Sequence, residues 1–326
     1  MTSNQPGANG AAQSAPRPYV VAVVLTWNDV DMARACIRSL IGNGYRSMQI
    51  VLVDNGSDFP TIAPLEREFP GLVTVQLSEN TGFCGGCNAG MKKALEMGAD
   101  YVFLLNNDTI VDSIAVSELV KAMEERPETA LASALMLYPG CERSVQDYRS
   151  VVHRDRARVT RFGADEPASE AHRRTVETEF APACAVMFRA RALNEVGMFD
   201  ETFFTNWEDY DICLRFVDAG WKILVVGTAE VVHMEGQTTG LASPFITYFS
   251  VRNRLICLCR YASASGILVN TPYILRTFFW QVRSYGFTNM ACHWAFAKGV
   301  LHFLLGVRGK GTAPTSRDDK RTGKKR

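Results

Sequence analysis

Three polar residues that could bind a ligand follow an apolar run in the stretch FLLNNDT. They are Asn106, Asn107 and Asp108, two amides and one carboxylate. Because Asp108 is the only anionic group among them, a hard divalent cation bound here would need further oxygen donors, such as those of a diphosphate. A polar strand end that leads into a turn would use the same residues. The stretch therefore indicates either a ligand site or a turn.

The stretch TNWEDYDICLR contains a second candidate, an acidic cluster at the start of a predicted helix. The helix dipole favours Glu208, Asp209 and Asp211 in a first turn, and Asp211 can pair with Arg215 one turn later. These effects give each acid a structural role but leave the aromatic surroundings unexplained. Removal of water by aromatic rings raises the pKa of a carboxyl group and suits it to general-base catalysis. The aromatic residues are Phe203, Phe204, Trp207 and Tyr210.

Three further motifs have both a functional and a structural interpretation. Asp54 ends the run IVLVD, where its carboxylate could accept hydrogen bonds from a nucleotide base, but Asp-Asn-Gly-Ser also favours a turn. The loop ENTGFCGGCNAG has glycines that let the backbone approach a ligand, and the helix after it would favour an anion at its N-terminus. Its spacing matches neither a GxGxxG fingerprint nor a P-loop. His233 ends a predicted strand, where a histidine is more often structural than a metal ligand.

The cysteines favour a reducing compartment over a disulfide framework, since there are nine of them, spread over the whole chain. Cys84 and Cys87 form a CxxC pair, which is found in zinc and redox sites. A zinc site would need a matching second pair, and Cys257 and Cys259 form only a CxC within a predicted helix. We therefore do not expect metal or redox chemistry at these cysteines.

Short β-branched runs alternate with helical patterns from Tyr19 onward, as in βαβ units. The runs are continuously apolar, so both faces of each strand should be buried. This predicts an α/β fold with a mostly parallel central sheet flanked by helices. Ligands of such sheets bind beyond the carboxyl ends of the strands. The first four predicted strands are followed by the polar stretches TWND, DNGSD, SENTGFCGGCN and NNDT.

Composition divides the chain into four segments. Residues 1–18 contain no apolar core of signal-peptide length and predict a disordered leader. Residues 19–240 form the predicted α/β domain, in which the Arg-rich segment 140–179 is expected to be an irregular loop, either functional or disordered. Residues 241–308 predict amphipathic helices rich in aromatic residues, and residues 309–326 predict a basic, flexible tail.

Charge is distributed unevenly along the chain. After residue 240 there are 14 Lys and Arg but only two acids, Asp318 and Asp319, whereas the preceding part carries 21 basic and 32 acidic residues. A basic, apolar end predicts contact with an anionic surface, although solvated basic helix faces would have the same composition. No run reaches the roughly 18 apolar residues of a spanning helix. We expect a cytoplasmic protein that binds the inner face of an anionic membrane peripherally, with homo-oligomerisation as an alternative use of the aromatic helices.

Taken in order, these motifs resemble family 2 glycosyltransferases of the GT-A fold, of the bacterial rhamnosyltransferase-like kind that build surface polysaccharides. The resemblance extends from about Tyr19 to Gly240 and is most specific where helix, acidic cluster, strand and histidine follow one another. It implies inverting transfer of a sugar from a nucleotide-diphosphate sugar, with dTDP-L-rhamnose favoured, to a hydroxyl of a polysaccharide or glycolipid. No nucleic acid partner is expected. The matching stretches are VVLTWND, IVLVDNGS, ENTGFCGGCNAGM, YVFLLNNDT and AVMFRARALNEVGMFDETFFTNWEDYDICLRFVDAGWKILVVGTAEVVHMEG.

The resemblance also implies residue roles. Asp209 matches the general base that takes the proton of the acceptor hydroxyl, and Glu208 would position the acceptor or tune that base. Asp108 stands at the last position of the family's Asp-x-Asp motif and, with His233, would bind the divalent cation, Mg²⁺ or Mn²⁺, that bridges the donor diphosphate. The segment 140–179 would lie on the acceptor side. Donor binding is implied for Thr26, Trp27, Asn28, Asp54, Asn55, Gly82, Phe83, Asn88, Asn106 and Asn107.

Two residues depart from the family's pattern on the donor side. Trp27 stands where Tyr is more usual, and Cys87 stands where Asn is frequent. These departures leave the identity of the donor sugar open. Cys87 and Asn106 also support an alternative, a nucleotide-sugar-binding or scaffold protein on the GT-A fold without catalysis. A third alternative is a redox protein built on Cys84 and Cys87.

Overall fold

The structure of the protein is a computed structural model that describes residues 17–140, 143–234, 243–266 and 289–313, together with residues 272, 276, 279 and 283. The predicted leader and the predicted basic tail lie largely outside the described residues. None of the described helices is both long enough and apolar enough to cross a bilayer.

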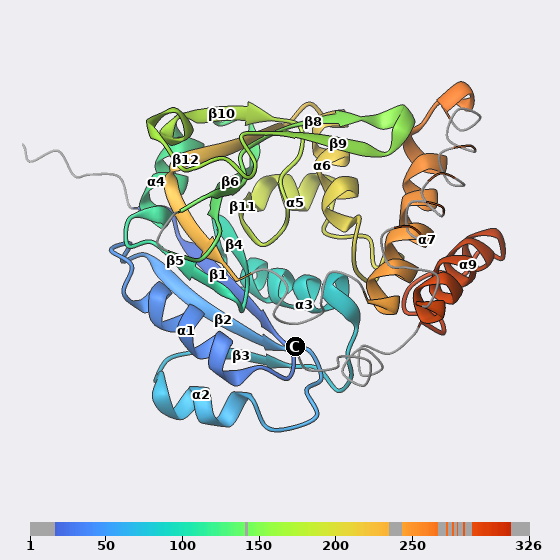
Figure 1. The fold of residues 1–326 in the computed structure, drawn as a ribbon. Helices are drawn as coiled ribbons and strands as arrows, with labels where there is room; N and C mark the ends of the chain where they lie inside the picture. Colours follow the sequence, from blue (N-terminus) through green and yellow to red (C-terminus); the bar gives the residue numbers. More distant parts are fainter. Residues whose placement is uncertain are drawn as a thin grey trace, which may run out of the picture.

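The first half of the chain forms parallel strands connected by helices (Figure 1). Its elements are β1 (Val20–Thr26), α1 (Val30–Ile41), β2 (Met48–Asp54), α2 (Ile62–Glu68), β3 (Val73–Gln76), α3 (Gly82–Glu96) and β4 (Tyr101–Asn106). β1 lies between β2 and β4 and is parallel to both, and β3 continues the parallel sheet beyond β2. The βαβ pattern predicted from the sequence is therefore present.

Helices cover both faces of this sheet because successive strand residues point to opposite faces. In β1, Val20, Ala22 and Val24 share a buried cluster with α1 and α2. Val21 and Val23 point the other way, into a cluster that includes α3. All five side chains are 0% exposed, which explains why the run is continuously apolar rather than alternating.

The second half of the chain makes the complete sheet mixed. Its elements are β5 (Thr109–Val111), α4 (Ala115–Glu124), β6 (Thr129–Leu137), β7 (Val145–Asp147), β8 (Arg149–His153), η1 (Arg154–Arg156), β9 (Arg158–Phe162), η2 (Glu170–Arg173), β10 (Thr175–Thr178), β11 (Ala185–Arg189), α5 (Ala190–Val196), α6 (Glu208–Asp218) and β12 (Lys222–His233). β11 runs antiparallel to both neighbours, β4 and β6, while β12 is parallel to β6. Over the described residues the sheet has ten strands, in the order β10-β12-β6-β11-β4-β1-β2-β3, with β5 on β12 and β7 on β6. The predicted α/β fold with flanking helices is confirmed, but parallel pairing predominates only in the first half.

The segment 140–179 differs from its prediction, because the structure has strands where the sequence predicts an irregular loop. β8 and β9 form a separate two-stranded sheet, and β10 extends the main sheet beside β12. In β8 only Ser150 is buried, and no residue of β9 is. Strands that are exposed and rich in Arg lack the apolar run by which a buried strand is recognised.

Two long helices, α7 (Pro244–Tyr261) and α9 (Met290–Leu304), follow the sheet and lie side by side at the edge of the molecule (Figure 1). Leu255, Ile256 and Cys257 of α7 belong to the buried cluster that also contains α3, α5 and α6. The helices predicted in segment 241–308 are present where the chain is described. α7 is part of the main core, whereas the sequence suggests an appendage.

Close packing of α3 on the sheet can be tested at Gly90. A Cβ on this residue would overlap Val23 and lie 2.8 Å from Val53 Cγ2. We expect Gly90→Ala to lower the free energy of unfolding by about 1–3 kcal/mol in urea denaturation, as overpacking of a core does. Gly44→Ala is the matched control, since its Cβ would be 3.7 Å from Ser113 O. Equal stability of the two variants would contradict the packing described here.

Candidate functional site

The carboxyl ends of β1, β2 and β4 bring three residues of the predicted donor site together. Thr26 is the register partner of Asp54, and Leu25 is the partner of Asn106. Thr26 and Asp54 are each 1% exposed, and the amide of Asn107 donates to the Thr26 hydroxyl at 3.3 Å. These side chains therefore lie along the edge where open α/β sheets bind ligands.

Hydrogen bonds between the loops after β1 and β2 use two of the predicted residues. Asp54 Oδ1 accepts from the backbone N–H and the hydroxyl of Ser57, at 3.0 and 2.5 Å. This is the turn chemistry expected of Asp-Asn-Gly-Ser. Asn28, with a φ of 58°, donates to Asp58 Oδ2 and accepts from its N–H, while Trp27 beside it is half-buried. The structural interpretation of Asp54 thus holds for Oδ1, so a base would have to bind through Oδ2.

Asn55 and Gly82 shape the loop that leads into α3. Asn55 Nδ2 donates to Gly82 O at 2.8 Å, and Asn55 Oδ1 accepts from the Thr81 N–H and hydroxyl at 3.0 Å each. Gly82 has a φ of +79°, and a Cβ there would overlap Phe204 O. That carbonyl accepts from Cys84 N at 3.1 Å. The first turn of α3 is thus attached directly to the loop that precedes α6.

Phe83 and Asn88 contact the segment after α5. The Phe83 ring lies 5.9 Å from the Phe199 ring. Asn88 Nδ2 donates to Phe199 O and to Glu201 Oε1 at 2.9 Å, and Asn88 Oδ1 accepts from Phe199 N at 3.1 Å. Both ends of this amide are used within the protein. Asn88 therefore supports the loop after α5, and its contact with a donor stays a prediction.

Asp108 and His233 face each other where β5 and β12 meet. His233 Nε2 lies 3.3 Å from Asp108 Oδ1. His233 Nδ1 lies 2.9 Å from Gln146 Oε1, which can only accept, so Nδ1 carries the proton. In the neutral ring Nε2 then presents a lone pair toward the carboxylate. Asp108 Oδ1 is buried and has no hydrogen-bond partner within the described part of the chain, and a cation between the two groups would satisfy both.

These two side chains suit a divalent cation that takes its remaining ligands from elsewhere. Among the residues that the structure describes, no group of three or more His, Cys, Asp or Glu could hold a metal ion. Asp108 offers a carboxylate oxygen and His233 an imidazole nitrogen, whose ring is oriented by Gln146 as metal-binding histidines usually are. Phosphate oxygens of a bound ligand would complete the shell.

The predicted acidic pair lies at the start of α6 and is desolvated. Glu208 is 7% exposed, and none of the described residues forms a hydrogen bond with its buried Oε2. Burial, followed by the charge of Asp209, raises the pKa of Glu208 well above its usual value. Burial also raises the pKa of the half-buried Asp209 to about 6, while the Tyr210 N–H and Arg161 act to lower it. The loss of water predicted from the aromatic residues is therefore present.

Asp211, the third acid, is a structural carboxylate. Its side chain is fully buried, and Oδ2 accepts from Arg215 Nε at 2.8 Å, which is the pair predicted from the sequence. Oδ1 accepts from Arg260 and, at 2.6 Å, from the Tyr261 hydroxyl. Asp211 therefore joins α6 to α7, a contact that the sequence does not predict.

Asp147 and Arg161 are candidate site residues that the sequence analysis misses. Asp147 on β7 is 2% exposed, and Arg161 Nε lies 3.4 Å from its Oδ1. Neither carboxylate oxygen accepts a hydrogen bond from the residues that the structure describes. Burial raises the pKa of Asp147 to about 6. The charge of Arg161 lowers this pKa, whereas the charge of Asp209 raises it. The two aspartates are thus close enough to interact. Both residues lie in the segment that the sequence predicts to be an irregular loop. Without a predicted strand there, nothing in the sequence indicates that the Asp147 side chain is buried.

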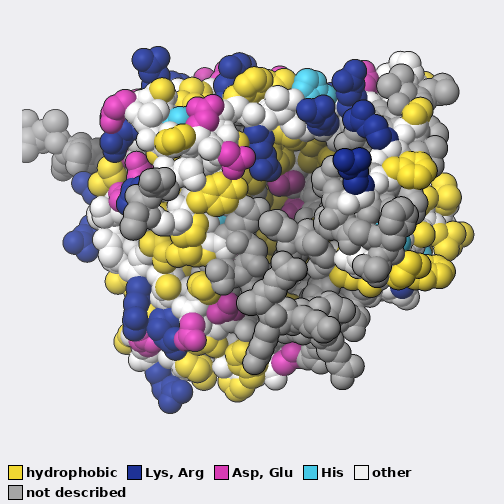
Figure 2. Space-filling view, in the orientation of Figure 1, with side chains coloured by type: hydrophobic (Ala, Val, Ile, Leu, Met, Phe, Trp, Pro, Cys, Tyr) yellow, Lys and Arg dark blue, Asp and Glu magenta, His cyan; other side chains and the backbone are white. Residues whose placement is uncertain are grey.

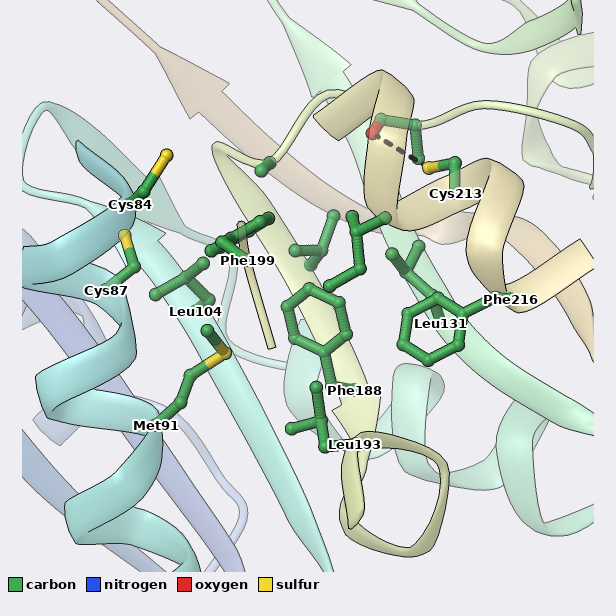
Figure 3. Close-up of a cluster of buried hydrophobic side chains, with 14 of the residues drawn as sticks. Cys84, Cys87, Met91, Leu104, Leu131, Phe188, Leu193, Phe199, Cys213 and Phe216 are labelled. Carbon is green, nitrogen blue, oxygen red and sulfur yellow. Dashed lines mark hydrogen bonds between the residues drawn. The ribbon is translucent and has the colours of Figure 1, made fainter. Parts of the chain in front are cut away.

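Cys84 and Cys87 lie on α3 with their thiols in the buried core near Met91 and Phe199 (Figure 3). Both are free and fully buried, and burial raises the pKa of each thiol well above its usual value. Thiols without thiolate character are poor nucleophiles and poor metal ligands. The CxxC spacing places both residues on one face of the helix, which here is the core face.

Comparison with known proteins identifies the family. The model of glycosyl transferase family 2 matches residues 21–197. One relative is N-acetylglucosaminyl-diphospho-decaprenol L-rhamnosyltransferase from Mycobacterium tuberculosis, 25% identical over 215 residues that cover 60% of this chain and 69% of the relative. Another is dTDP-rhamnosyl transferase RfbF from Shigella flexneri, 22% identical over 255 residues that cover 73% of this chain and 79% of the relative.

A crystal structure of GalNAc-T7 with UDP, GalNAc and Mn²⁺ resembles the fold with a TM-score of 0.57 and 16% identity. The match covers 72% of this chain and 47% of GalNAc-T7, so the chain spans about half the length of that protein. This likeness supports the predicted fold alone. The family model covers more than half of the chain and confirms the predicted membership: the protein belongs to glycosyl transferase family 2 and is a rhamnosyltransferase-like glycosyltransferase.

Proposed function

We propose that the protein transfers L-rhamnose from dTDP-L-rhamnose, with inversion at the anomeric carbon, to a hydroxyl of a saccharide or lipid-linked saccharide. The observation that carries this proposal is the pair of desolvated carboxylates Glu208 and Asp209, at the end of a loop whose Phe204 carbonyl bonds to the first turn of α3. The names of the two relatives support the donor, and one of them names a decaprenol-linked substrate. UDP and Mn²⁺ in GalNAc-T7 support a nucleotide donor and a divalent cation.

The two carboxylates suit different tasks because their protonation states differ. Asp209, with a pKa of about 6, is ionised at neutral pH yet is a stronger base than an ordinary aspartate. Burial and the charge of Asp209 raise the pKa of Glu208 well above its usual value, which favours the protonated form of Glu208. Two carboxyl groups whose pKa values differ in this way provide one base and one hydrogen-bond donor. We assign Asp209 as the general base and Glu208 as the group that holds the acceptor.

The transfer is a displacement at the anomeric carbon. The acceptor oxygen attacks this carbon while its proton passes to Asp209, and the bond to the diphosphate oxygen breaks with its electron pair on the diphosphate. A divalent cation held by Asp108 and His233 would supply positive charge that stabilises this leaving group. Asn106 and Asn107 would donate hydrogen bonds to the donor. The N-terminus of α3 would contribute less, because Asn80 Oδ1 accepts from the Gly82 N–H and Phe204 O accepts from the Cys84 N–H.

The metal assignment can be tested by comparing two substitutions in the stretch NND. We expect Asp108→Asn to weaken Mn²⁺ binding in the presence of dTDP at least about tenfold, because it removes the anionic ligand. Asn106→Asp should retain Mn²⁺ binding, since Asn106 is a neutral member of the donor site. Calorimetric titration of both variants with Mn²⁺ measures the difference. An equal loss of affinity in the two variants would refute the separate roles.

The general base can be tested by substitution and by pH. We expect Asp209→Asn to lower kcat by about 10²- to 10⁴-fold while the affinity for the nucleotide sugar stays nearly unchanged. In the wild type the rate should rise with pH up to about 6 and then level off, because Asp209 accepts a proton only when ionised. Asp218→Asn is the matched control on the same helix, since this side chain is 48% exposed and pairs with Arg154 at the surface. Wild-type turnover by Asp209→Asn would exclude this base.

An apolar face of α9 supports a lipid-linked acceptor. Trp294 is 72% exposed, Leu304 71% and Leu301 52%, and their spacing places them on one side of the helix. Figure 2 shows hydrophobic side chains gathered over α9. Arg308 and Lys310 follow the helix, and the remaining sequence has six Lys and Arg against two Asp. We propose that this face lies on an anionic membrane, where apolar side chains insert and basic groups meet lipid phosphates.

Vesicle binding tests the α9 face. We expect Trp294→Ser with Leu304→Ser to weaken binding to phosphatidylcholine vesicles containing phosphatidylglycerol at least about tenfold, because two large apolar side chains no longer insert. The control variant combines Ile41→Ser with Ile114→Ser. The side chains of Ile41 and Ile114 are 55% and 52% exposed and lie outside α9. Unchanged vesicle binding by the α9 variant would refute membrane contact. A change in its oligomeric state in light scattering, with vesicle binding unchanged, would assign the face to dimerisation.

A further inference from the structure

The loop before α6 holds three non-glycine residues in the left-handed region of backbone conformation. Phe204, Asn206 and Trp207 have φ values of 67°, 63° and 77°. Residues with side chains adopt this conformation rarely, and several together persist only where surrounding contacts impose it. The loop leads directly into Glu208 and Asp209. The contacts that hold the loop therefore also fix the position of the two carboxylates.

Asn253 of α7 provides three of these contacts. Its Nδ2 lies 2.9 Å from Phe203 O, 2.7 Å from Thr205 O and 2.8 Å from Asn206 O. Its Oδ1 accepts from Arg252 Nε at 2.9 Å. The Asn253 side chain is 0% exposed, so solvent water does not compete for these bonds. One buried amide thus connects three carbonyls of the strained loop.

Arg252 holds the same loop from the neighbouring position. Its Nη2 donates to Phe203 O at 2.9 Å and to Thr202 O at 3.2 Å. The guanidinium lies over the rings of Tyr248 and Phe249, 5.3 and 4.9 Å from their centres. Its planar arrangement of donors suits several carbonyls at once, which an ammonium group could not match.

The buried charge of Arg252 is compensated by hydrogen bonds rather than by a carboxylate. Arg252 is fully buried, and within the described part of the chain it forms no ion pair with a carboxylate. Burial lowers the pKa of its guanidinium. An unpaired buried charge destabilises a fold unless hydrogen bonds compensate for the lost water. The compensation comes from Thr202 O and Phe203 O of the loop, and from Asn253 Oδ1, the Tyr248 hydroxyl and Gly309 O on the other side. The arginine therefore joins the loop to α7 and to the segment after α9.

The same helix also holds the chain after the acidic pair. Arg260 and Tyr261 bind Asp211 in the first turn of α6. The loop before α6 also touches the first turn of α3 through the bond from Cys84 N to Phe204 O. α7 therefore fixes the chain both before and after Glu208 and Asp209.

We propose that Arg252 and Asn253 are positioning residues for glycosyl transfer, which hold loop 202–207 so that Glu208 and Asp209 stay in place beside the first turn of α3. This inference rests on the proposed function and adds the requirement that α7 be part of the catalytic machinery. Neither residue touches the reacting atoms. Their effect on the reaction is transmitted through the loop backbone.

Asn253→Asp tests the proposal with little change in size. The substitution keeps the oxygen that accepts from Arg252 but places a carboxylate oxygen against the carbonyls of Phe203, Thr205 and Asn206. We expect kcat to fall about 10²-fold, as a misplacement of about 1 Å can cause, with the KM for the donor changed by less than about twofold. Backbone amides of residues 202–211 should exchange hydrogen faster than in the wild type.

Asn43→Asp is the matched control for loss of a buried amide. Asn43 is 4% exposed, donates to Asp112 O at 2.8 Å and accepts from Tyr45 N at 3.1 Å, next to the end of α1. We expect it to lower the melting temperature without changing kcat. Arg252→Lys is a second test variant, which keeps the charge but loses the planar donors. We expect it to lower kcat. If Asn253→Asp does not fold, this variant tests the positioning role instead.

Wild-type kcat in a folded test variant would overturn the proposal, and so would a rise in KM with kcat unchanged. A wild-type protein that transfers no sugar from any donor would refute the proposed function instead. In that case the hydrogen exchange of residues 202–211 still tests whether Asn253 holds the loop. Unchanged exchange of residues 202–211 in Asn253→Asp would overturn it.

Discussion

A fully buried carboxylate, Asp211, makes the contact on which the arrangement of the candidate site depends. It binds Arg215 within α6 and Arg260 and Tyr261 on α7. Removing one member of such a network leaves a buried charge uncompensated, which is far more destabilising than losing a surface ion pair. The first turn of α6 is therefore fixed relative to α7. The two desolvated carboxylates that precede Asp211 take their position from this contact and from the loop that α7 holds.

The sheet edge could be predicted from the sequence because local pattern is sufficient there. Continuous apolar runs identify strands buried on both faces, and parallel neighbours end at the same edge. The proximity of Thr26, Asp54 and Asn106 follows from that register. The desolvation of Glu208 and Asp209 could be predicted for a similar reason, since four aromatic residues lie within a few positions of them in the sequence.

Contacts between distant segments could not be predicted in this way. Arg252 reaches Thr202, 50 residues earlier, and a polar pair within an apolar helix has no local signal for burial. Asp147 was missed because its strand, β7, is only three residues long, VQD, and has no apolar run by which a buried strand is recognised. Asn55 and Asn88 show a further limit. Each bonds to loop backbone, and a single sequence cannot distinguish an amide that binds a ligand from one that binds a neighbouring loop.

Product analysis of the wild-type protein with a panel of nucleotide-diphosphate sugars and a saccharide acceptor tests the central claim most directly. The assay would be run with Mn²⁺, with Mg²⁺ and with a chelator, and the anomeric configuration of the product would be read by NMR. The account predicts transfer from one donor, dTDP-L-rhamnose, only with a divalent cation and with inverted configuration. Binding of nucleotide sugars without transfer from any of them would contradict it and favour a scaffold protein on the same fold.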